Sequence, residues 1–350
     1  MIKKISFVLC VIAIIFSCKG AQTNNQLLEN INKTMVYFNY TKNEICLLDI
    51  DTGAVIKSHK LDFDVQQYVV DKYGYRSKWY YSNGDRNIYL MRSYVDWNNH
   101  SNNNIRISRI DIETFEVSEI FYSTEDFHNF CVLDDYLYLL SHAEPSTGQS
   151  NPEINYIVKY NLLDETQEII DFNKLLSEDE QIYAHDFYVA ENAIILNGWY
   201  GKLQLKNIYQ YDLTTETIAV LDENATIFSI AGDKILYRKN DIELDYGNDF
   251  ETIKVIRSKF LLHDLTTNNT IVLSDIINSD MLAYFLINKD VIIFARERKT
   301  IMTIINKLSL FPNYENILKD YFIADIYGNA QRKIFQNSDS ISIFGVMDNK

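Results

Sequence analysis

One pattern recurs six times along the chain: a strand of alternating apolar residues, an Asp or Asn, a tight polar turn and a second strand. The Asp or Asn positions are Asp49, Asp111, Asn161, Asp212, Asp264 and Asp325, at spacings of 62, 50, 51, 52 and 61. These residue types start turns because their side chains can bond backbone N–H groups two residues further on. Each copy is therefore predicted to be a β-hairpin.

A second hairpin precedes most of these copies. It begins at Phe130 in the third repeat, and its counterparts begin at Phe187, Phe228 and Tyr284. Two hairpins make a unit of four strands and about 50 residues, which is the size of a propeller blade. The chain also has 25 Tyr and 19 Phe, and this bias favours strands. The prediction is an all-β fold, a six-bladed β-propeller of four-stranded antiparallel blades; the alternative is a β-sandwich or a solenoid.

The two ends of the repeat region indicate how the ring closes. Residues 341–349 match the first strand and turn of a blade, and residues 34–40 match a second strand. The closing blade is therefore predicted to take its innermost strand from the C-terminus and its other three from the N-terminal part. Closure of this kind removes sheet edges that would otherwise pair with other chains. The propeller domain is placed at residues 34–350.

The N-terminus has the pattern of an exported protein. A basic start is followed by an apolar run from Ile5 to Phe16, so residues 1–17 are predicted to be a signal peptide. The run ends in Ile15-Phe16-Ser17-Cys18, which resembles the bacterial lipobox. That resemblance implies cleavage before Cys18 and acylation of its thiol, as with palmitate. The alternative is an ordinary signal peptide that happens to contain a Cys.

Residues 18–33 are mostly polar and are predicted to be a flexible tether. With the repeats, the lipobox makes the chain similar to bacterial six-bladed β-propeller lipoproteins. The resemblance implies a cell-envelope protein held on a membrane through lipid on Cys18, and two or more acyl chains give stable anchoring. Lys19 is not acidic, which favours the outer membrane, with a periplasmic or a surface-exposed orientation left open.

Charge and missing motifs narrow the functional classes. The formal net charge of −15 disfavours nucleic acid as a partner. The sequence has no Gly-rich phosphate loop, no Gly-x-Ser-x-Gly elbow and no His-Glu-x-x-His. No catalytic residue, metal site or cofactor is therefore predicted. Cys46 and Cys131 lie in apolar strand patterns of different repeats and are expected to be buried thiols rather than a disulfide.

Two sets of residues are candidates for ligand binding. The long segments all fall on one face of the predicted ring, and they carry Trp97, Trp199 and Tyr200. Aromatic rings with a polar edge suit sugar, peptide or protein contacts, unless they pack down as a lid. Counting seven residues back from the first turn of each blade gives a column of Trp79, His128, His185, Thr226, Leu282 and Ser342. The two histidines can bind an anion or a metal, or be a coincidence among six His.

These features lead to a non-catalytic binding or scaffold module that engages a protein or glycan partner through its loop-rich face. One alternative is an envelope enzyme that acts on glycan or peptide at the channel mouth around His128 and His185. Another is a structural role in envelope assembly that needs no small-molecule pocket.

Overall fold

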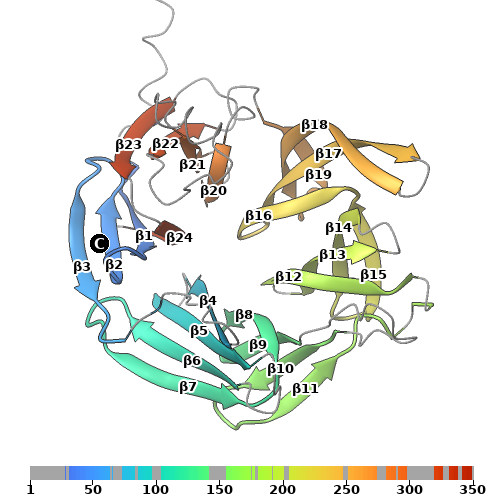
Figure 1. Ribbon diagram of the computed structural model, residues 1–350, viewed down its shortest axis with the longest axis horizontal. Helices are drawn as coiled ribbons and strands as arrows, with labels where there is room; N and C mark the ends of the chain where they lie inside the picture. Colours follow the sequence, from blue (N-terminus) through green and yellow to red (C-terminus); the bar gives the residue numbers. More distant parts are fainter. Residues whose placement is uncertain are drawn as a thin grey trace, which may run out of the picture.

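The computed structural model describes Leu28 and residues 31–63, 65, 73–82, 86–96, 104–141, 155–174, 176–177, 180–190, 192–200, 205–246, 251–273, 281–288, 291–297, 319–325, 331–337 and 341–348. Within these residues, 24 strands form six antiparallel sheets of four strands each. The sheets stand around a central axis (Figure 1). The chain is a six-bladed β-propeller, as predicted.

The strands of each blade are given from the axis outward. Blade 1 has β24 (Ile341–Asp348), β1 (Lys33–Asn39), β2 (Glu44–Asp49) and β3 (Val55–Lys60). Blade 2 has β4 (Tyr73–Ser82), β5 (Asn87–Asp96), β6 (Asn104–Asp111) and β7 (Val117–Ser123). Blade 3 has β8 (Phe127–Leu133), β9 (Tyr136–Ser141), β10 (Ile157–Asn161) and β11 (Gln167–Ile170).

The second half of the ring repeats this order. Blade 4 has β12 (Ile182–Ala190), β13 (Ala193–Tyr200), β14 (Leu205–Asp212) and β15 (Thr217–Asp222). Blade 5 has β16 (Ala225–Ala231), β17 (Lys234–Tyr246), β18 (Glu251–Asp264) and β19 (Asn269–Val272). Blade 6 has β20 (Met281–Asn288), β21 (Val291–Glu297), β22 (Lys319–Asp325) and β23 (Gln331–Asn337).

The predicted closure is confirmed in blade 1. β24, the last strand of the chain, pairs with β1, the first, from Lys33 opposite Asp348 to Asn39 opposite Ile341. The inner strand of the blade thus comes from the C-terminus and the outer three from the N-terminal part. Backbone hydrogen bonds between the two ends of the chain close the ring.

The Asp and Asn residues found in the sequence end the third strand of every blade. The side chains of Asp49, Asp111, Asn161, Asp212 and Asp264 each accept one or two backbone N–H groups of the turn, at 2.7–3.0 Å. Four positions after each of them comes a residue with positive φ: Gly53, Phe115, Glu165, Glu216 and Asn268. One local geometry is therefore repeated in blades 1 to 5. We call the face that carries these turns and those between first and second strands the turn face, and the opposite one the loop face.

The hydrophobic core is divided into six clusters, one at each boundary between neighbouring blades. Blade strands are covered on both faces, so the inner ones are apolar almost throughout; six of the seven residues of β1 are buried. Buried asparagines add polar links. Asn197 of blade 4, for example, donates its Nδ2 to the Ala225 carbonyl of blade 5 and accepts the Ile227 N–H, at 3.0 and 3.3 Å. Cys46 and Cys131 are buried thiols in these cores and are not joined in a disulfide, as expected.

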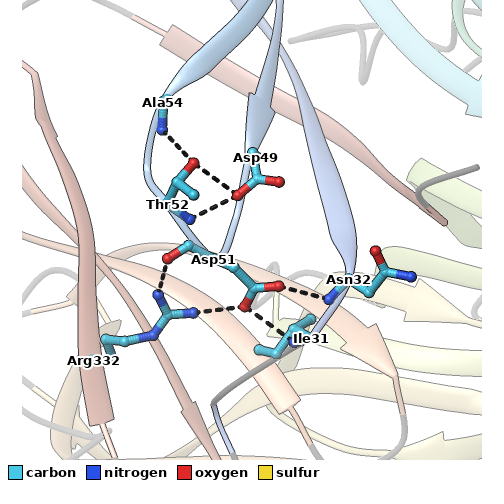
Figure 2. Close-up of polar contacts among 7 residues, drawn as sticks. All are labelled: Ile31, Asn32, Asp49, Asp51, Thr52, Ala54 and Arg332. Atoms are coloured by element: carbon cyan, nitrogen blue, oxygen red, sulfur yellow. Dashed lines mark hydrogen bonds and ion pairs between the residues drawn. The ribbon is translucent and has the colours of Figure 1, made fainter.

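The boundary between blades 6 and 1 has an additional element from the N-terminal segment (Figure 2). Asp51, in the turn of blade 1, accepts the backbone N–H groups of Ile31 and Asn32 at 3.0 and 2.8 Å. Arg332 of blade 6 donates to the carboxylate of Asp51 at 3.1 Å and to its backbone carbonyl. Leu28 is 1% exposed in the core of the same boundary. These contacts fix the C-terminal end of the predicted tether to the ring, on the turn face.

One segment expected as a long loop is regular structure. Residues 238–246 and 251–257 form the outer ends of β17 and β18, a two-stranded ribbon that extends beyond the rest of blade 5 (Figure 1). Ile242 lies opposite Val255 in the register, while Asp241 lies opposite Arg257. Apolar and oppositely charged pairs alternate, so the strand pattern simply continues past the sheet. The predicted signal peptide, Cys18 and Trp97 lie outside the described residues. In the described part of the chain, no helix has the length and apolar character needed to cross a membrane.

Candidate functional site

A cavity of about 800 Å³ occupies the turn-face half of the central channel. It reaches the turns themselves, because Leu133, Asn192 and Asp233 at the ends of the inner strands belong to its wall. Its other described walls come from β4, β8, β12, β16 and β24, with Ala193 and Gln210 of blade 4 and Leu265 and Thr266 of blade 5. The cavity lies within the size range of small-molecule sites, about 300–1,000 Å³.

Aromatic rings form much of this wall: Trp79, Tyr80, Tyr81, Tyr188, Phe228 and Phe344. Trp79 is held by stacking on Phe344 of blade 1, with ring centroids 5.1 Å apart and planes 7° apart. Tyr81 lies directly over Gly345, where a Cβ would come within 2.3 Å of its ring. The ring positions are therefore set by the contact between blades 1 and 2.

The described wall of the cavity is electrically neutral except at one place. Among its residues only Asp233 carries a charge, and Lys234 pairs with it at 3.4 Å. Burial raises the pKa of the Cys131 thiol to about 11, so it is protonated at neutral pH. Burial also raises the pKa of Tyr188 well above its ordinary value.

Several neutral polar groups of the wall have no internal hydrogen bond. Among the described residues, none bonds to the hydroxyl of Tyr188, the amide of Gln210, the side chain of Asn192 or the hydroxyl of Ser342. The first three belong to blade 4 and Ser342 belongs to blade 1, on the opposite side of the ring (Figure 1). Polar groups without a partner inside a cavity are available to a ligand.

A second polar cluster lies along the inner strands of blades 2, 3 and 4. The carboxylate of Asp186 accepts Lys78 Nζ at 3.3 Å, Asn129 Nδ2, and the Phe187 N–H at 3.1 Å. Lys78 and Asn129 were not singled out in the sequence. Each lies next to a member of the predicted column, Trp79 or His128, so the column was one residue away from this cluster.

The two candidate histidines are both located at β-bulges. The pairing of β8 with β9 skips His128, and that of β12 with β13 skips His185. In β16 the skipped residue is Phe228, which is nearer to the turn. Counting residues back from the turn therefore aligns positions that differ in register, because a bulge adds a residue to one strand.

The ring of His185 stacks on Trp199 of the same blade, with centroids 4.8 Å apart. Lys206 Nζ lies 5.5 Å from the ring centroid of Trp199. Burial, with a smaller effect of Lys206, lowers the pKa of His185 to about 4, so the ring is neutral at pH 7. His128 is half-buried.

Of the other candidates, Trp79 lines the cavity. Tyr200 ends β13, opposite Ile182 and Leu205 in the register, and its side chain lies outside the described residues. Within the described ranges, no group of three or more His, Cys, Asp or Glu side chains is placed to hold a metal ion.

No protein-family model matches the sequence, and no curated protein matches it. Among solved structures, TolB from Acinetobacter baumannii is similar over 90% of this chain and 65% of its own, with 14% identity and a TM-score of 0.47. A chain of a nidogen/laminin complex is similar over 90% of this chain and 97% of its own, with 8% identity and a TM-score of 0.48. A puromycin hydrolase is similar over 86% and 42%, with 8% identity and a TM-score of 0.44.

This chain thus spans less than two thirds of the TolB chain and less than half of the hydrolase. At such identities a likeness concerns the arrangement of blades. The function has to be argued from the residues of this chain.

Proposed function

We propose that this protein is a lipid-anchored envelope protein that binds a ligand in its central cavity without transforming it. The observation that carries the proposal is the cavity wall, which combines aromatic rings with the unpartnered groups of Tyr188, Asn192, Gln210 and Ser342. Binding sites for small ligands have this make-up: a mainly apolar enclosure with a few convergent polar groups.

The same groups support binding rather than catalysis. General acid–base catalysis works best with a group that titrates near the operating pH. The amides of Asn192 and Gln210 and the hydroxyl of Ser342 do not titrate, and burial moves the pKa of Tyr188 away from neutrality. On the loop face, the neutral His185 is engaged with Trp199, and Asp186 is engaged with Lys78 and Asn129.

Anchoring rests on the lipobox, Ile15-Phe16-Ser17-Cys18, after a basic start. The structure refines what such an anchor would do. Leu28 is buried between blades 6 and 1, so ten peptide steps separate Cys18 from a residue that is fixed to the ring. Ten peptide steps reach at most about 35 Å. The lipid would therefore be attached on the turn face, where the cavity also reaches the surface.

The anchor is tested by growing cells with a palmitate analogue that can be labelled. We expect the wild type to be labelled and membrane-bound, and Cys18→Ser to lose the label and leave the membrane fraction. Cys10→Ser, inside the predicted signal peptide, is the matched control and should keep both. An unlabelled wild type, or a labelled Cys18→Ser, would contradict the anchor.

Binding is tested by thermal shift of the full chain in detergent against a library of oligosaccharides, peptides and amphipathic small molecules. Ala190→Trp fills the cavity from the end of β12, and Val220→Trp adds the same ring to an exposed position of β15. We expect at least one compound to stabilise the wild type and Val220→Trp but not Ala190→Trp. No shift by any compound, or equal shifts in all three proteins, would overturn the proposal.

A further inference from the structure

We propose that the ligand of the central cavity is an uncharged oligosaccharide. This inference rests on the proposed binding function and specifies its ligand class. It follows from three properties of the wall: its charge, its aromatic faces and the position of its unpartnered polar groups.

The charge of the site disfavours ionic ligands of either sign. An anion would enter a chain of net charge −15 and meet no cation among the described lining residues, and the nearby Lys234 is paired with Asp233 and Asp264. A cation would meet no free carboxylate among the described lining residues, since Asp233 is already paired. Moving an unpaired charge into such a site costs several kcal/mol. An uncharged ligand avoids this cost.

The aromatic rings favour a ligand with flat, weakly polar faces. The faces of Trp79 and Phe344 pack mainly on each other, and Phe344 is buried, so the rings open to a ligand are those of the half-buried Tyr188 and Phe228. Phe228 is held by Phe260, with centroids 5.5 Å apart. Rings that are held in place offer large contact areas at little entropic cost. The C–H faces of pyranose rings suit such surfaces, while their hydroxyls point to the edges.

The unpartnered groups of the wall have the same hydrogen-bonding capacity as sugar hydroxyls. An amide, a phenol and an aliphatic hydroxyl can each donate and accept, as a sugar hydroxyl does. Three of the groups lie on blade 4 and Ser342 lies across the channel on blade 1. A ligand that uses both sides has to extend across the cavity, which favours an oligosaccharide over a monosaccharide. An extended peptide would instead use a row of backbone groups along one strand edge.

The test is calorimetry on the full chain, purified in a detergent without a sugar headgroup. The uncharged probes are maltotetraose, cellotetraose and chitotetraose; the charged ones are tetragalacturonate and tetrameric chitosan; an uncharged tetrapeptide represents the peptide class. We expect at least one uncharged tetrasaccharide to bind more than tenfold more tightly than the charged probes and the peptide.

Variants show whether binding occurs in the cavity. We expect Tyr188→Ala to weaken binding at least tenfold and Gln210→Ala to weaken it several-fold. Tyr122→Ala, which removes an exposed ring from the outer strand β7, should leave it unchanged. Gln210→Ala breaks no hydrogen bond to a described residue, so it remains informative if Tyr188→Ala fails to fold.

The outcomes separate the two proposals. If a charged probe or the peptide binds best and Ala190→Trp abolishes that binding, the cavity is a binding site but its ligand is not a neutral sugar. If a neutral tetrasaccharide binds equally to Gln210→Ala, Tyr188→Ala and Ala190→Trp, the site is wrong. If none of these probes binds and no compound of the thermal-shift library binds, both the oligosaccharide proposal and the proposed binding function are wrong.

Discussion

The boundary between blades 6 and 1 and the central cavity use polar side chains in opposite ways. At the boundary, the carboxylate of Asp51 receives two backbone N–H groups and the guanidinium of Arg332 (Figure 2). In the cavity, the side chains of Tyr188 and Gln210 have no hydrogen-bond partner among the described residues.

This contrast indicates that the polar groups at the boundary serve to close the ring, whereas those of the cavity serve to recognise a ligand. Buried polar groups in folded proteins are nearly always paired, because an unpaired one costs about 1–3 kcal/mol. The saturated Asp51 is therefore part of what holds the ends of the chain together. The cavity side chains that bond to no described residue are at least partly exposed, so they contribute little to folding, and under the proposed function they serve the ligand. The predictions below test this division, from the largest expected change in stability to the smallest.

Gly53→Ala should be the most damaging change. Gly53 has a φ of +70°, and a Cβ there would lie 2.2 Å from the backbone carbonyl oxygen of Ile334 in blade 6. The carbonyl belongs to β23 and can move only with its strand, so overpacking and backbone strain add up to about 2–4 kcal/mol. Urea unfolding measures the loss as a lower midpoint at constant slope.

The matched control for Gly53→Ala is Glu216→Ala. Glu216 occupies the same turn position in blade 4, with a φ of 54°, and is exposed. It should change stability by less than about 0.5 kcal/mol. Equal losses at both positions would mean that the turn, rather than the contact between blades 1 and 6, sets the cost.

Asp51→Ala should cost about 2–3 kcal/mol. It leaves the Ile31 and Asn32 N–H groups without their acceptor and leaves Arg332 only the backbone carbonyl of residue 51. The N-terminal segment should also become sensitive to limited proteolysis near Asn32. Asp164→Ala removes a carboxylate that bonds only within its own turn, to Thr166, and should leave both properties nearly unchanged. A proteolysis pattern identical to the wild type would show that Asp51 does not hold the segment.

His185 makes stability depend on pH. Its pKa is lowered to about 4, mainly by burial, whereas an unfolded His has a pKa near 6.5. Above pH 6.5 the ring is neutral in both states. Between pH 6.5 and about 4 the unfolded state binds a proton that the folded state does not, so stability falls as the pH drops. The full shift would give about 3 kcal/mol, but the ring is only half-buried and solvent screens it, so we expect a loss of about 1–2 kcal/mol.

His185→Phe keeps a ring on Trp199 and removes the titration. The difference in unfolding free energy between wild type and variant should therefore move in favour of the variant as the pH is lowered from 7 to 4. A difference that stays constant over this range would show that His185 does not titrate as the structure implies.

The fold could be predicted from the sequence because the same strand-and-turn pattern is repeated six times. Asp212 and Asp264 mark equivalent turns, and their side chains bond the turn N–H groups in the same way. Such local signals need no knowledge of distant residues. Closure was predictable for the same reason, since residues 341–348 and 33–39 each match one strand of a blade.

The cavity could not be found in this way. Its polar groups come from different strands, Gln210 from β14 and Ser342 from β24, and no short motif joins them. Bulges at His128 and His185 also shift the register on which the predicted column depended. A bulge inserts one extra residue into one strand, and that residue and its neighbours can be of any ordinary type. A single sequence therefore gives little sign of where a bulge lies. The sequence therefore pointed to Trp79 and His128, which are the neighbours of Lys78 and Asn129, rather than to the two residues that bond Asp186.

Tyr188→Phe and Gln210→Ala should have the smallest effect on stability, within about 0.5 kcal/mol of the wild type. Neither change breaks an internal hydrogen bond among the described residues, and Tyr188→Phe keeps the ring in the wall. Urea unfolding in the absence of ligand provides the measurement, with Asp51→Ala as the sensitive comparison. A loss above about 1 kcal/mol for either variant would mean that these groups are used in folding. A negligible loss together with weaker ligand binding would assign them to recognition, because only the complex would then depend on them.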